Sequence, residues 1–411
     1  MQNQILCMNL WETEISKHYT GKDLKKVLQK KKLIKCLYDK GVQSNAYLAK
    51  ELHISVPTVQ VILNELIEDG LVSEHGLGDS SGGRRPSLYG LAENSFYTMG
   101  IDIGRYTTRV GIYNHLNESV SNNQTLDIKL ENKESFVDEV YEFALSVVIK
   151  SKIDTKKLIG IGINMPGLID YQKGINNTYL NFDTPVGELF EKKFQKRVFL
   201  ENDARARAIS ELRFGAAKGK SNALVFHIDW GVGLGMILDG KLHRGASGFA
   251  GEFSHMPIQE EGALCHCGKH GCLETIASGM ALSKRIDEGL QAGNESILLR
   301  GNSGSITQFN LETIIDAVNN GDMFAISLLS NMAHHLGRGI ASLIQILNPE
   351  LVILGGRLSK TGEYLITPIK QSLYLHCIPK LREDVNIVVS ELDKEAGVLG
   401  AIAVVAENAF K

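Results

Sequence analysis

The stretch Gly251–Glu274 reads GEFSHMPIQEEGALCHCGKHGCLE and holds three of the six cysteines of the chain. These three fall within eight residues and are Cys265, Cys267 and Cys272. Three thiolates this close complete a tetrahedral zinc site when one more nitrogen or sulfur ligand is supplied. Gly268 and Gly271 allow the backbone to turn tightly between the ligands. The fourth ligand stays open at this point, and the candidates are His255, His266 and His270.

We interpret the zinc as structural, because four protein ligands leave no open position for a reacting water. The alternative is a group of thiols without a metal. A disulfide is less favoured, because three cysteines leave one thiol over. The other cysteines are scattered at Cys7, Cys36 and Cys377, and the sequence has no feature typical of an oxidising compartment.

Two carboxylates and an imidazole lie on the same metal-braced segment. Glu252 and His255 precede the cysteines, and Glu274 follows them. Ionised carboxylates accept hydrogen bonds in pairs, which suits the neighbouring hydroxyl groups of a sugar. The alternative, a solvated charged loop, fits the adjacent Glu260 and Glu261 better. The segment therefore predicts a sugar-binding site next to the zinc.

The segment resembles the ROK family of repressors and sugar kinases. The matching residues are Gly251–His255 and the run from Cys265 to Glu274. The resemblance implies that His255 is the fourth zinc ligand, beside Cys265, Cys267 and Cys272. It also implies that Glu252, His255 and Glu274 contact the sugar.

The totals describe an ordinary globular protein. The chain has 411 residues, 43% hydrophobic and 22% charged residues, and a net charge of −3. This length predicts two or three domains. No apolar run approaches the roughly 20 residues of a membrane span, and the N-terminus lacks the pattern of an export signal. We expect a cytoplasmic protein.

The first ninety residues carry the pattern of a helix-turn-helix. Lys17–Lys40 contains nine lysines and two aspartates, which indicates a polyanionic partner unless it is only a solvated helix face. Ser44 is expected to cap a short helix that ends near Leu52, and Ser55 a second one that ends at Gly70. Apolar residues in the second helix follow the spacing of a buried stripe. They are Val59, Ile62, Leu63, Leu66 and Ile67.

The second helix has the size of a recognition helix for the major groove. Gln and Asn suit adenine edges, and Val suits a thymine methyl group. We expect base contacts from Thr58, Gln60, Val61 and Asn64. Lysines of residues 22–35 are expected to meet phosphates. The alternative is a three-helix unit with no DNA contact.

A β-wing is predicted after the second helix, with a glycine-rich tip at Gly76–Gly83. The tip is followed by Arg84 and Arg85, which we expect to enter a narrow minor groove. The sequence Gly-Gly-Arg-Arg-Pro at 82–86 resembles the wing of ROK repressors, the NagC/XylR type. The plain kinases of the family lack the whole segment.

The C-terminal three hundred residues carry two similar units rich in strand and glycine, at Phe96–Tyr113 and Ala223–His243. They fit two related α/β lobes, as in the actin-like ATPase architecture that ROK proteins share. A buried strand from Val198 leads into Asn202 and Asp203 at the start of a helix. Asp203 could be a simple helix cap. The resemblance instead implies that Asn202, Asp203 and Gly167 belong to the sugar site, and that Asp203 matches the catalytic base of the kinases.

Two phosphate loops depart from the kinase pattern. Kinases of the family have Asp-x-Gly-Gly-Thr where this chain has Asp102-Ile-Gly-Arg-Tyr106. They have Gly-Thr-Gly where this chain has Asp229-Trp-Gly231. Bulky or acidic side chains at these positions oppose a close approach of triphosphate. We therefore expect no catalytic residues, with Asp203 a vestige.

The whole predicts an α/β protein with a winged helix-turn-helix, a two-lobed actin-like domain and a zinc knuckle. The expected divisions are an arm at 1–22, the winged helix at 23–92, and the ROK domain at 96–411. Within the last, lobe one spans 96–203 and 396–411, and lobe two spans 204–395. The expected function is a sugar-responsive repressor that binds operator DNA as a homodimer or dimer of dimers, with no membrane contact. The alternatives are a sugar kinase with a DNA-binding head and a zinc-stabilised scaffold.

Overall fold

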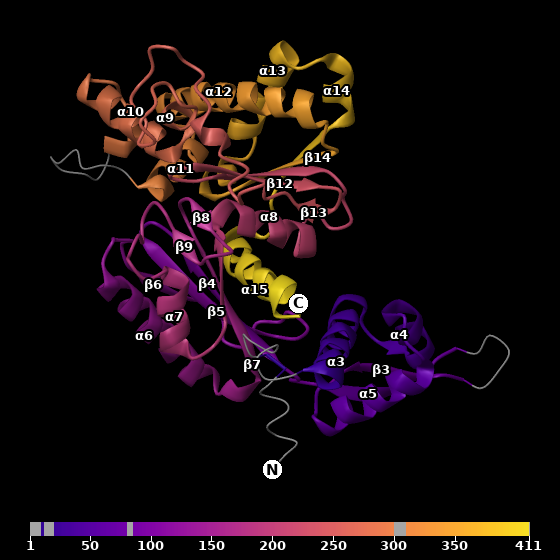
Figure 1. The fold of residues 1–411 in the computed structure, drawn as a ribbon. Coiled ribbons are helices and arrows are strands. Elements are labelled where there is room, and N and C mark those ends of the chain that lie inside the picture. The colour runs from indigo at the N-terminus through magenta and orange to yellow at the C-terminus, as the bar shows by residue number, and fades with distance from the viewer. Residues whose placement is uncertain (1–9, 12–19, 80–84, 300–309, 411) are drawn as a thin grey trace. The chain divides into compact units, whose positions relative to one another are not determined.

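The computed structural model describes residues 10–11, 20–79, 85–299 and 310–410. The chain divides into two compact units (Figure 1). Unit one consists of Met1–Asn202 with Ala401–Lys411, and unit two of Asp203–Gly400. Each unit has a five-stranded sheet of its own.

The N-terminal part of unit one is a winged helix-turn-helix, as predicted. Its elements are α3 (Gly21–Lys40), β1 (Gln43–Ser44), α4 (Asn45–Leu52), α5 (Val56–Glu68), β2 (Val72–Leu77) and β3 (Ser87–Leu91). The Ser44 hydroxyl accepts the N–H of Tyr47 at 3.2 Å, and the Ser55 hydroxyl that of Thr58 at 3.3 Å. Both serines therefore cap their helices as expected. The three strands pair antiparallel in the order β1-β3-β2.

One hydrophobic core joins the winged helix to the rest of unit one. Four aromatic side chains from four segments meet in it, and we call them the aromatic joint: Trp11, Tyr38, Phe96 and Phe410. The ring centroid of Trp11 lies 6.0 Å from Phe96 and 5.5 Å from Phe410. That of Tyr38, on α3, lies 5.8 Å and 5.7 Å from the same two rings. The Tyr38 hydroxyl also donates to Asn117 Oδ1 at 2.5 Å. Trp11 is thus packed within its own chain.

The sheet of unit one has the order β10-β7-β4-β5-β6. Its strands are β4 (Tyr97–Ile103), β5 (Thr107–Asn114), β6 (Gln124–Asp127), β7 (Leu158–Met165) and β10 (Val198–Asn202). The other elements are α6 (Glu134–Ser151), η1 (Thr155–Lys157), α7 (Val186–Phe194) and a small hairpin of β8 (Ile169–Asp170) and β9 (Ile175–Asn176). Strands β4, β7 and β10 are parallel. Their carboxyl ends therefore meet at one edge of the sheet and bring Asp102, Asn164 and Asn202 there.

The last helix, α15 (Ala396–Ala409), packs against strand β7 in unit one. A Cβ atom at Gly162 of β7 would lie 1.9 Å from the carbonyl oxygen of Ala401. Only glycine permits this approach of two backbones.

The sheet of unit two has the order β13-β12-β11-β14-β15. Its strands are β11 (Ala223–Ile228), β12 (Val232–Leu238), β13 (Lys241–Leu242), β14 (Leu351–Gly355) and β15 (Asn386–Val389). Its α-helices are α8 (Asp203–Phe214), α9 (Glu274–Ala277), α10 (Gly279–Gln291), α11 (Leu311–Asn319), α12 (Met323–Leu347), α13 (Glu363–His376) and α14 (Pro379–Asp384). Short 3-10 turns complete it: η2 (Phe253–His255), η3 (Ile297–Leu299), η4 (Arg357–Thr361) and η5 (Asp393–Glu395).

The longest helix of the described residues is α12, which runs beside α13 (Figure 1). The Asp322 carboxylate caps it by accepting the N–H of Ala325 at 2.7 Å. The predicted hairpin turn at Asp239-Gly240 joins β12 to β13, and both residues have positive φ.

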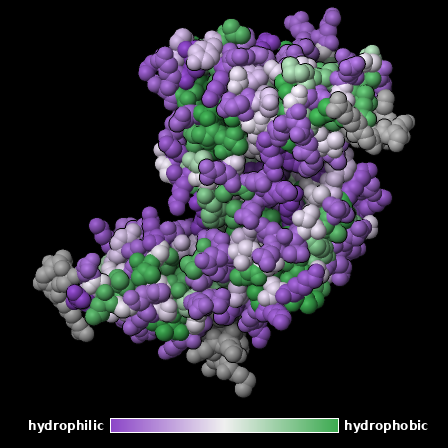
Figure 2. Space-filling view, turned by 180° about the vertical axis from the view of Figure 1, so that it is seen from behind, coloured by the Kyte–Doolittle hydropathy of each residue, from purple (hydrophilic) through white to green (hydrophobic). Residues whose placement is uncertain are grey.

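Hydrophilic residues dominate the face of the molecule drawn in Figure 2, and the hydrophobic ones form separate patches. Among the helices of the described residues, none is long and apolar enough to cross a membrane.

Candidate functional site

Polar residues of the predicted site lie where strand β10 meets helix α8. Asn202 ends the strand, and its Nδ2 donates to the carbonyl oxygen of Gly167 at 3.2 Å. Asp203 begins the helix, and its Oδ1 accepts the N–H of Ala204 at 2.8 Å. Unit one therefore brings Asn202 and Gly167 together. Asn164 lies at the same sheet edge, and its side-chain Oδ1 is buried and has no hydrogen-bond partner among the described residues.

The carboxylates of Asp203, Glu252 and Glu274 form a cluster with His255 in unit two. His255 lies 3.9 Å (Nε2) from a Glu252 oxygen and 3.8 Å (Nδ1) from a Glu274 oxygen. Burial raises the pKa of Glu252 above its usual range; Arg205 opposes this rise, and Asp203 and Glu274 add to it. The cluster is therefore a concentrated set of acceptors for hydroxyl groups.

Two glycines make room for this cluster. A Cβ atom at Gly231 would lie 2.8 Å from the Glu274 carboxylate. Gly251, directly before Glu252, has a φ of +101°, and a Cβ there would lie 2.4 Å from the carbonyl oxygen of Leu234. Larger residues at either position would displace a carboxylate of the cluster.

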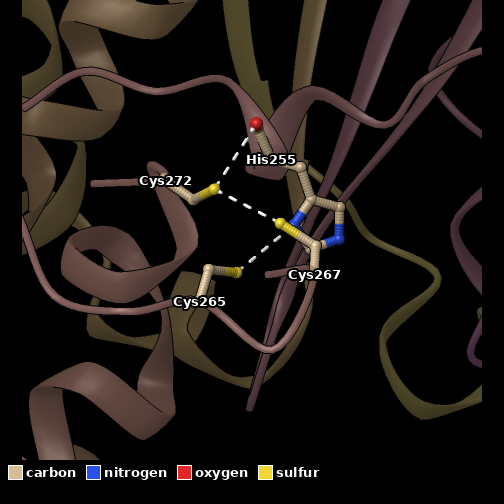
Figure 3. A group of neighbouring side chains, drawn as sticks. All are labelled: His255, Cys265, Cys267 and Cys272. Atoms are coloured by element: carbon tan, nitrogen blue, oxygen red, sulfur yellow. Dashed lines mark hydrogen bonds between the residues drawn. The ribbon is translucent and has the colours of Figure 1, made fainter. Parts of the chain in front are cut away.

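The cysteine-rich segment is folded as two short antiparallel bridges, Pro257 with Cys272 and Leu264 with His270. A Cβ atom at Gly271 would lie only 1.7 Å from the carbonyl oxygen of Gln259, so the turn requires glycine there. Figure 3 shows the side chains that this turn brings together, which are His255, Cys265, Cys267 and Cys272. Their four ligand atoms all lie within 4.8 Å of one another.

The spacing of these atoms fits zinc. With Zn–S of about 2.3 Å and Zn–N of about 2.0–2.1 Å, a tetrahedron has edges of about 3.8 Å between sulfurs and about 3.6 Å between sulfur and nitrogen. The distance from Cys267 Sγ to Cys272 Sγ is 3.6 Å, and that from Cys265 Sγ to His255 Nδ1 is 3.5 Å. The donor set and its dimensions therefore suit a closed tetrahedral site.

The geometry also selects among the three histidines. His270 Nδ1 is hydrogen-bonded to the carbonyl oxygen of Gly262 at 3.0 Å. His266 Nδ1 lies 3.4 Å from a Glu274 oxygen, and only His255 belongs to the four-ligand group with the cysteines. Burial, followed by the charges of His266 and Lys269, lowers the pKa of His255, which favours the neutral imidazole that a metal requires.

The second phosphate loop holds an ion pair that sequence reasoning missed. Arg357 donates two hydrogen bonds to the Asp229 carboxylate, from Nε at 2.9 Å and from Nη2 at 2.5 Å. Its remaining nitrogen donates to Glu312 at 3.0 Å, and its guanidinium lies 5.9 Å from the Trp230 ring. Burial alone would raise the pKa of Asp229, but Arg357 holds it well below its usual range. The sequence signal was the position of Arg357, directly after the Gly355-Gly356 pair.

The first phosphate loop carries two large side chains. Arg105 donates from Nη1 to the Tyr179 hydroxyl at 3.0 Å, and the Tyr106 side chain is 48% exposed. The loop is closed by the N–H of Gly104, which donates to the carbonyl oxygen of Thr107 at 2.8 Å. Both positions that are small in the kinase pattern are therefore filled.

The recognition helix α5 exposes only part of the predicted DNA-binding set. Val61 is 54% exposed, and Asn64 is exposed. Thr58 and Gln60 are half-buried, and the Thr58 hydroxyl lies 2.8 Å from that of Ser55. Arg85 is exposed, whereas Arg84 lies outside the described residues.

The expectation that lysines 22–35 meet phosphates is wrong for Lys30 and Lys31, which are both buried. The Lys30 ammonium pairs with Asp69 at 3.1 Å and with Glu65 at 3.2 Å. The Lys30 side chain therefore stabilises the contact of α3 with α5 and its C-terminus.

Comparison with known proteins agrees with these features. The sequence pattern of the ROK family matches residues 98–408, and that of a winged helix-turn-helix DNA-binding domain matches residues 28–73. The chain is 31% identical over 386 residues to the xylose repressor of Caldicellulosiruptor bescii, which covers 93% of this chain and 96% of that one. It is 32% identical over 315 residues to the glucokinase of Thermotoga maritima, covering 75% of this chain and 97% of the kinase.

Among solved structures, a ROK family transcriptional regulator, a homologue of the Escherichia coli MLC protein, superposes with a TM-score of 0.78. It has 25% sequence identity and covers 94% of this chain and 97% of its own. The repressor and the regulator thus match almost the full length, whereas the kinase matches three quarters. The chain belongs to the ROK family and carries a winged helix-turn-helix at its N-terminus.

Proposed function

We propose that this protein is a cytoplasmic transcriptional repressor that binds operator DNA and responds to a sugar. The observation that carries the proposal is a combination of three features in one chain. They are a winged helix, a cluster of carboxylates that matches the sugar site of the family, and phosphate loops that differ from those of the kinases. The repressor branch of the family, the NagC/XylR type, has this organisation. The proposed genes under control are those of carbohydrate uptake or catabolism.

The sugar site is proposed from the residues that match the sugar contacts of the family. The residues proposed for it are Asn202, the backbone at Gly167, Asp203, Glu252, His255 and Glu274. Hydrogen bonds from hydroxyl groups to carboxylates are charge-assisted and strong. Asn164 Oδ1, which is buried and has no partner in the part of the chain that the structure describes, supports the proposal. A buried acceptor favours a donor brought by a ligand or water.

The metal of the knuckle is proposed to be zinc, held by His255, Cys265, Cys267 and Cys272. Burial raises the pKa of the Cys272 thiol to about 12, so a cation is needed to hold that sulfur as a thiolate at neutral pH. The role of the metal would be structural: it would keep Glu252, His255 and Glu274 at fixed positions.

We assign no kinase activity to the chain. A triphosphate at the second loop would have to draw Arg357 away from Asp229, which is part-buried with it, and the Asp229 carboxylate would repel the phosphate charge. At the first loop Arg105 and Tyr106 occupy positions that kinases leave small. Asp203 is retained, so the alternative function is an ATP-dependent sugar kinase with a DNA-binding head.

Operator binding is proposed to use two copies of the chain. The faces on α5 and the wing would meet half-sites about one DNA turn, roughly 34 Å, apart in a two-fold dimer. The wing arginines, Arg84 and Arg85, would reach the minor groove.

The aromatic joint supports a response of the winged helix to the ROK domain. Tyr38 of α3 packs directly on Phe96 and Phe410, so the winged helix shares a hydrophobic core with the first lobe of the ROK domain. A conformational change in that lobe could therefore reach the winged helix through this core. A sugar can shift operator affinity only by its differential affinity for two states. A change from 99:1 to 1:99 requires about 5.5 kcal/mol.

A thermal-shift screen with a panel of free and phosphorylated sugars tests the sugar proposal. A ligand that binds only the folded protein raises its melting temperature. The expected result is a rise with one sugar class that disappears in Asp203→Asn. ATP consumption that depends on that sugar and on Asp203 would support the kinase alternative instead.

A further inference from the structure

The side chains of the recognition helix differ in what they are already bonded to. Gln60 is held at both ends of its amide: Oε1 accepts from Asn45 Nδ2 at 3.2 Å, and Nε2 donates to Asn64 Oδ1 at 3.0 Å. Gln60 Nε2 also lies 3.3 Å from the Tyr89 hydroxyl. Tyr89 is on β3, the strand that returns from the wing, and is 2% exposed. Gln60 therefore links α4, α5 and the wing.

The helical repeat of 100° per residue gives the same division. The buried residues of α5 are Val59, Ile62, Leu63 and Leu66. The face opposite them carries Pro57, Val61 and Asn64, all exposed. Gln60 and Thr58 fall on the two flanks of this face, and both are half-buried. A groove that receives the exposed face meets Val61 and Asn64 first.

We infer that Val61 and Asn64 read the bases, and that Gln60 is a positioning residue that holds Asn64 and the wing in register. This inference rests on the proposed DNA-binding function. Val61 is an exposed branched apolar side chain, and the apolar group that a major groove offers is the thymine methyl. Val61 and Asn64 are three residues apart and so neighbours on the helix surface. The half-site therefore contains a thymine read by its methyl group, within one or two base pairs of the base bound by Asn64.

A use of Gln60 as a base reader would work against the structure. Both polar ends of its amide would have to leave Asn45, Asn64 and Tyr89 before an adenine edge could be bound. Each of these hydrogen bonds contributes to stability, and the buried Tyr89 hydroxyl would lose a partner. The same contacts explain why a positioning role suits a glutamine, which can donate and accept at once.

The test begins with selection of an operator from random duplex DNA by the full-length protein. Each thymine of the half-site is then replaced by deoxyuridine, which removes only the methyl group. Wild type is expected to lose about fourfold in affinity at one thymine, the value of one buried methyl group. Val61→Ala should bind the thymine and deoxyuridine operators equally at that position. Wild-type binding that ignores every deoxyuridine, or a Val61→Ala protein that keeps the full dependence, would overturn the inference.

Tyr89→Phe separates positioning from reading, because the Tyr89 side chain is too buried to touch DNA. Gln60→Ala and Tyr89→Phe are both expected to weaken operator binding by severalfold without relaxing the preference at any one base pair. The double variant should be no weaker than Gln60→Ala alone. Asn64→Ala, in contrast, should relax the preference at one base pair by tenfold or more.

If Gln60→Ala relaxes the preference at a single base pair while Tyr89→Phe has no effect, Gln60 reads a base and the inference is wrong. Melting temperatures that stay well above the temperature of the binding assay exclude a folding defect as the cause. If the selection enriches no sequence with wild-type protein, the proposed function itself fails, and the inference fails with it.

Discussion

Substitution of Cys267 by serine is expected to destabilise unit two far more than its exposure would suggest. Cys267 is the exposed member of the four-ligand group. A conservative change at an exposed position without a special role alters the free energy of unfolding by less than about 0.5 kcal/mol. If the group holds zinc, serine removes one of four ligands. A quarter of the roughly 10–16 kcal/mol of a structural zinc site is about 3 kcal/mol.

This difference is large enough to measure. For a unit of about 200 residues, Asp203–Gly400, each kcal/mol shifts the melting temperature by about 2–4 °C. Cys267→Ser should therefore lower the melting temperature of unit two by about 6–12 °C in calorimetry, and the purified variant should contain less than one zinc ion per chain. Sugar affinity should fall as well, because Glu252, His255 and Glu274 flank the metal.

Cys377→Ser is the matched control. Cys377 lies in the hydrophobic core of unit two and outside the four-ligand group. Its substitution makes the same chemical change and should leave one zinc ion bound per chain. A wild-type protein without zinc, or a Cys267→Ser variant that melts within about 1 °C of wild type, would refute the metal site.

Three further substitutions test other parts of the account. Asp203→Asn should weaken sugar binding by about ten- to hundredfold in calorimetric titration while operator affinity without sugar is unchanged, because a charge-assisted hydrogen bond is lost; equal sugar affinity would exclude Asp203 from the site. Phe410→Ala should lower the free energy of unfolding, measured in urea, by about 3–5 kcal/mol, because the ring is 4% exposed in the aromatic joint. The control Leu375→Ala, at a side chain that is 76% exposed, should change it by less than about 0.5 kcal/mol. Burial, with Arg207 next, lowers the pKa of His227 to about 3, so its contribution to stability is present above pH 6.5 and is lost as the pH falls toward 3. Wild type should lose about 1–2 kcal/mol between pH 7 and 5 through this group, and His227→Gln should lose less; identical pH slopes would contradict it.

The features predicted correctly from the sequence depend on neighbouring residues. Ser44 and Ser55 each cap a helix that starts at the next residue, and the apolar spacing after Ser55 defines the buried face of α5. The three cysteines of the knuckle are also close along the chain. In each case the physical cause lies within one helical turn or one loop. The causes are a helix cap, the helical periodicity of apolar residues, and the spacing of metal ligands.

The features that could not be predicted depend on residues far apart in the chain. Asp229 and Arg357 are joined only because β11 and β14 are parallel neighbours in the sheet. The burial of Lys30 and Lys31 follows from the packing of α3, which a count of lysines does not reveal. Likewise, Trp11 belongs to the aromatic joint because the first and last segments of the chain meet there. The hydrogen bonds of Gln60 with Asn45 and Tyr89 come from the same kind of tertiary contact.

The central claim is that a sugar bound in the ROK domain changes the affinity of the winged helix for DNA. The most direct measurement is the affinity of the full-length protein for its selected operator, titrated with each sugar that raises the melting temperature. We predict a change of at least tenfold with one such sugar, and the same change in Asp203→Asn only at about ten- to hundredfold higher sugar concentration. A sugar that binds tightly and leaves operator affinity unaltered would contradict the claim.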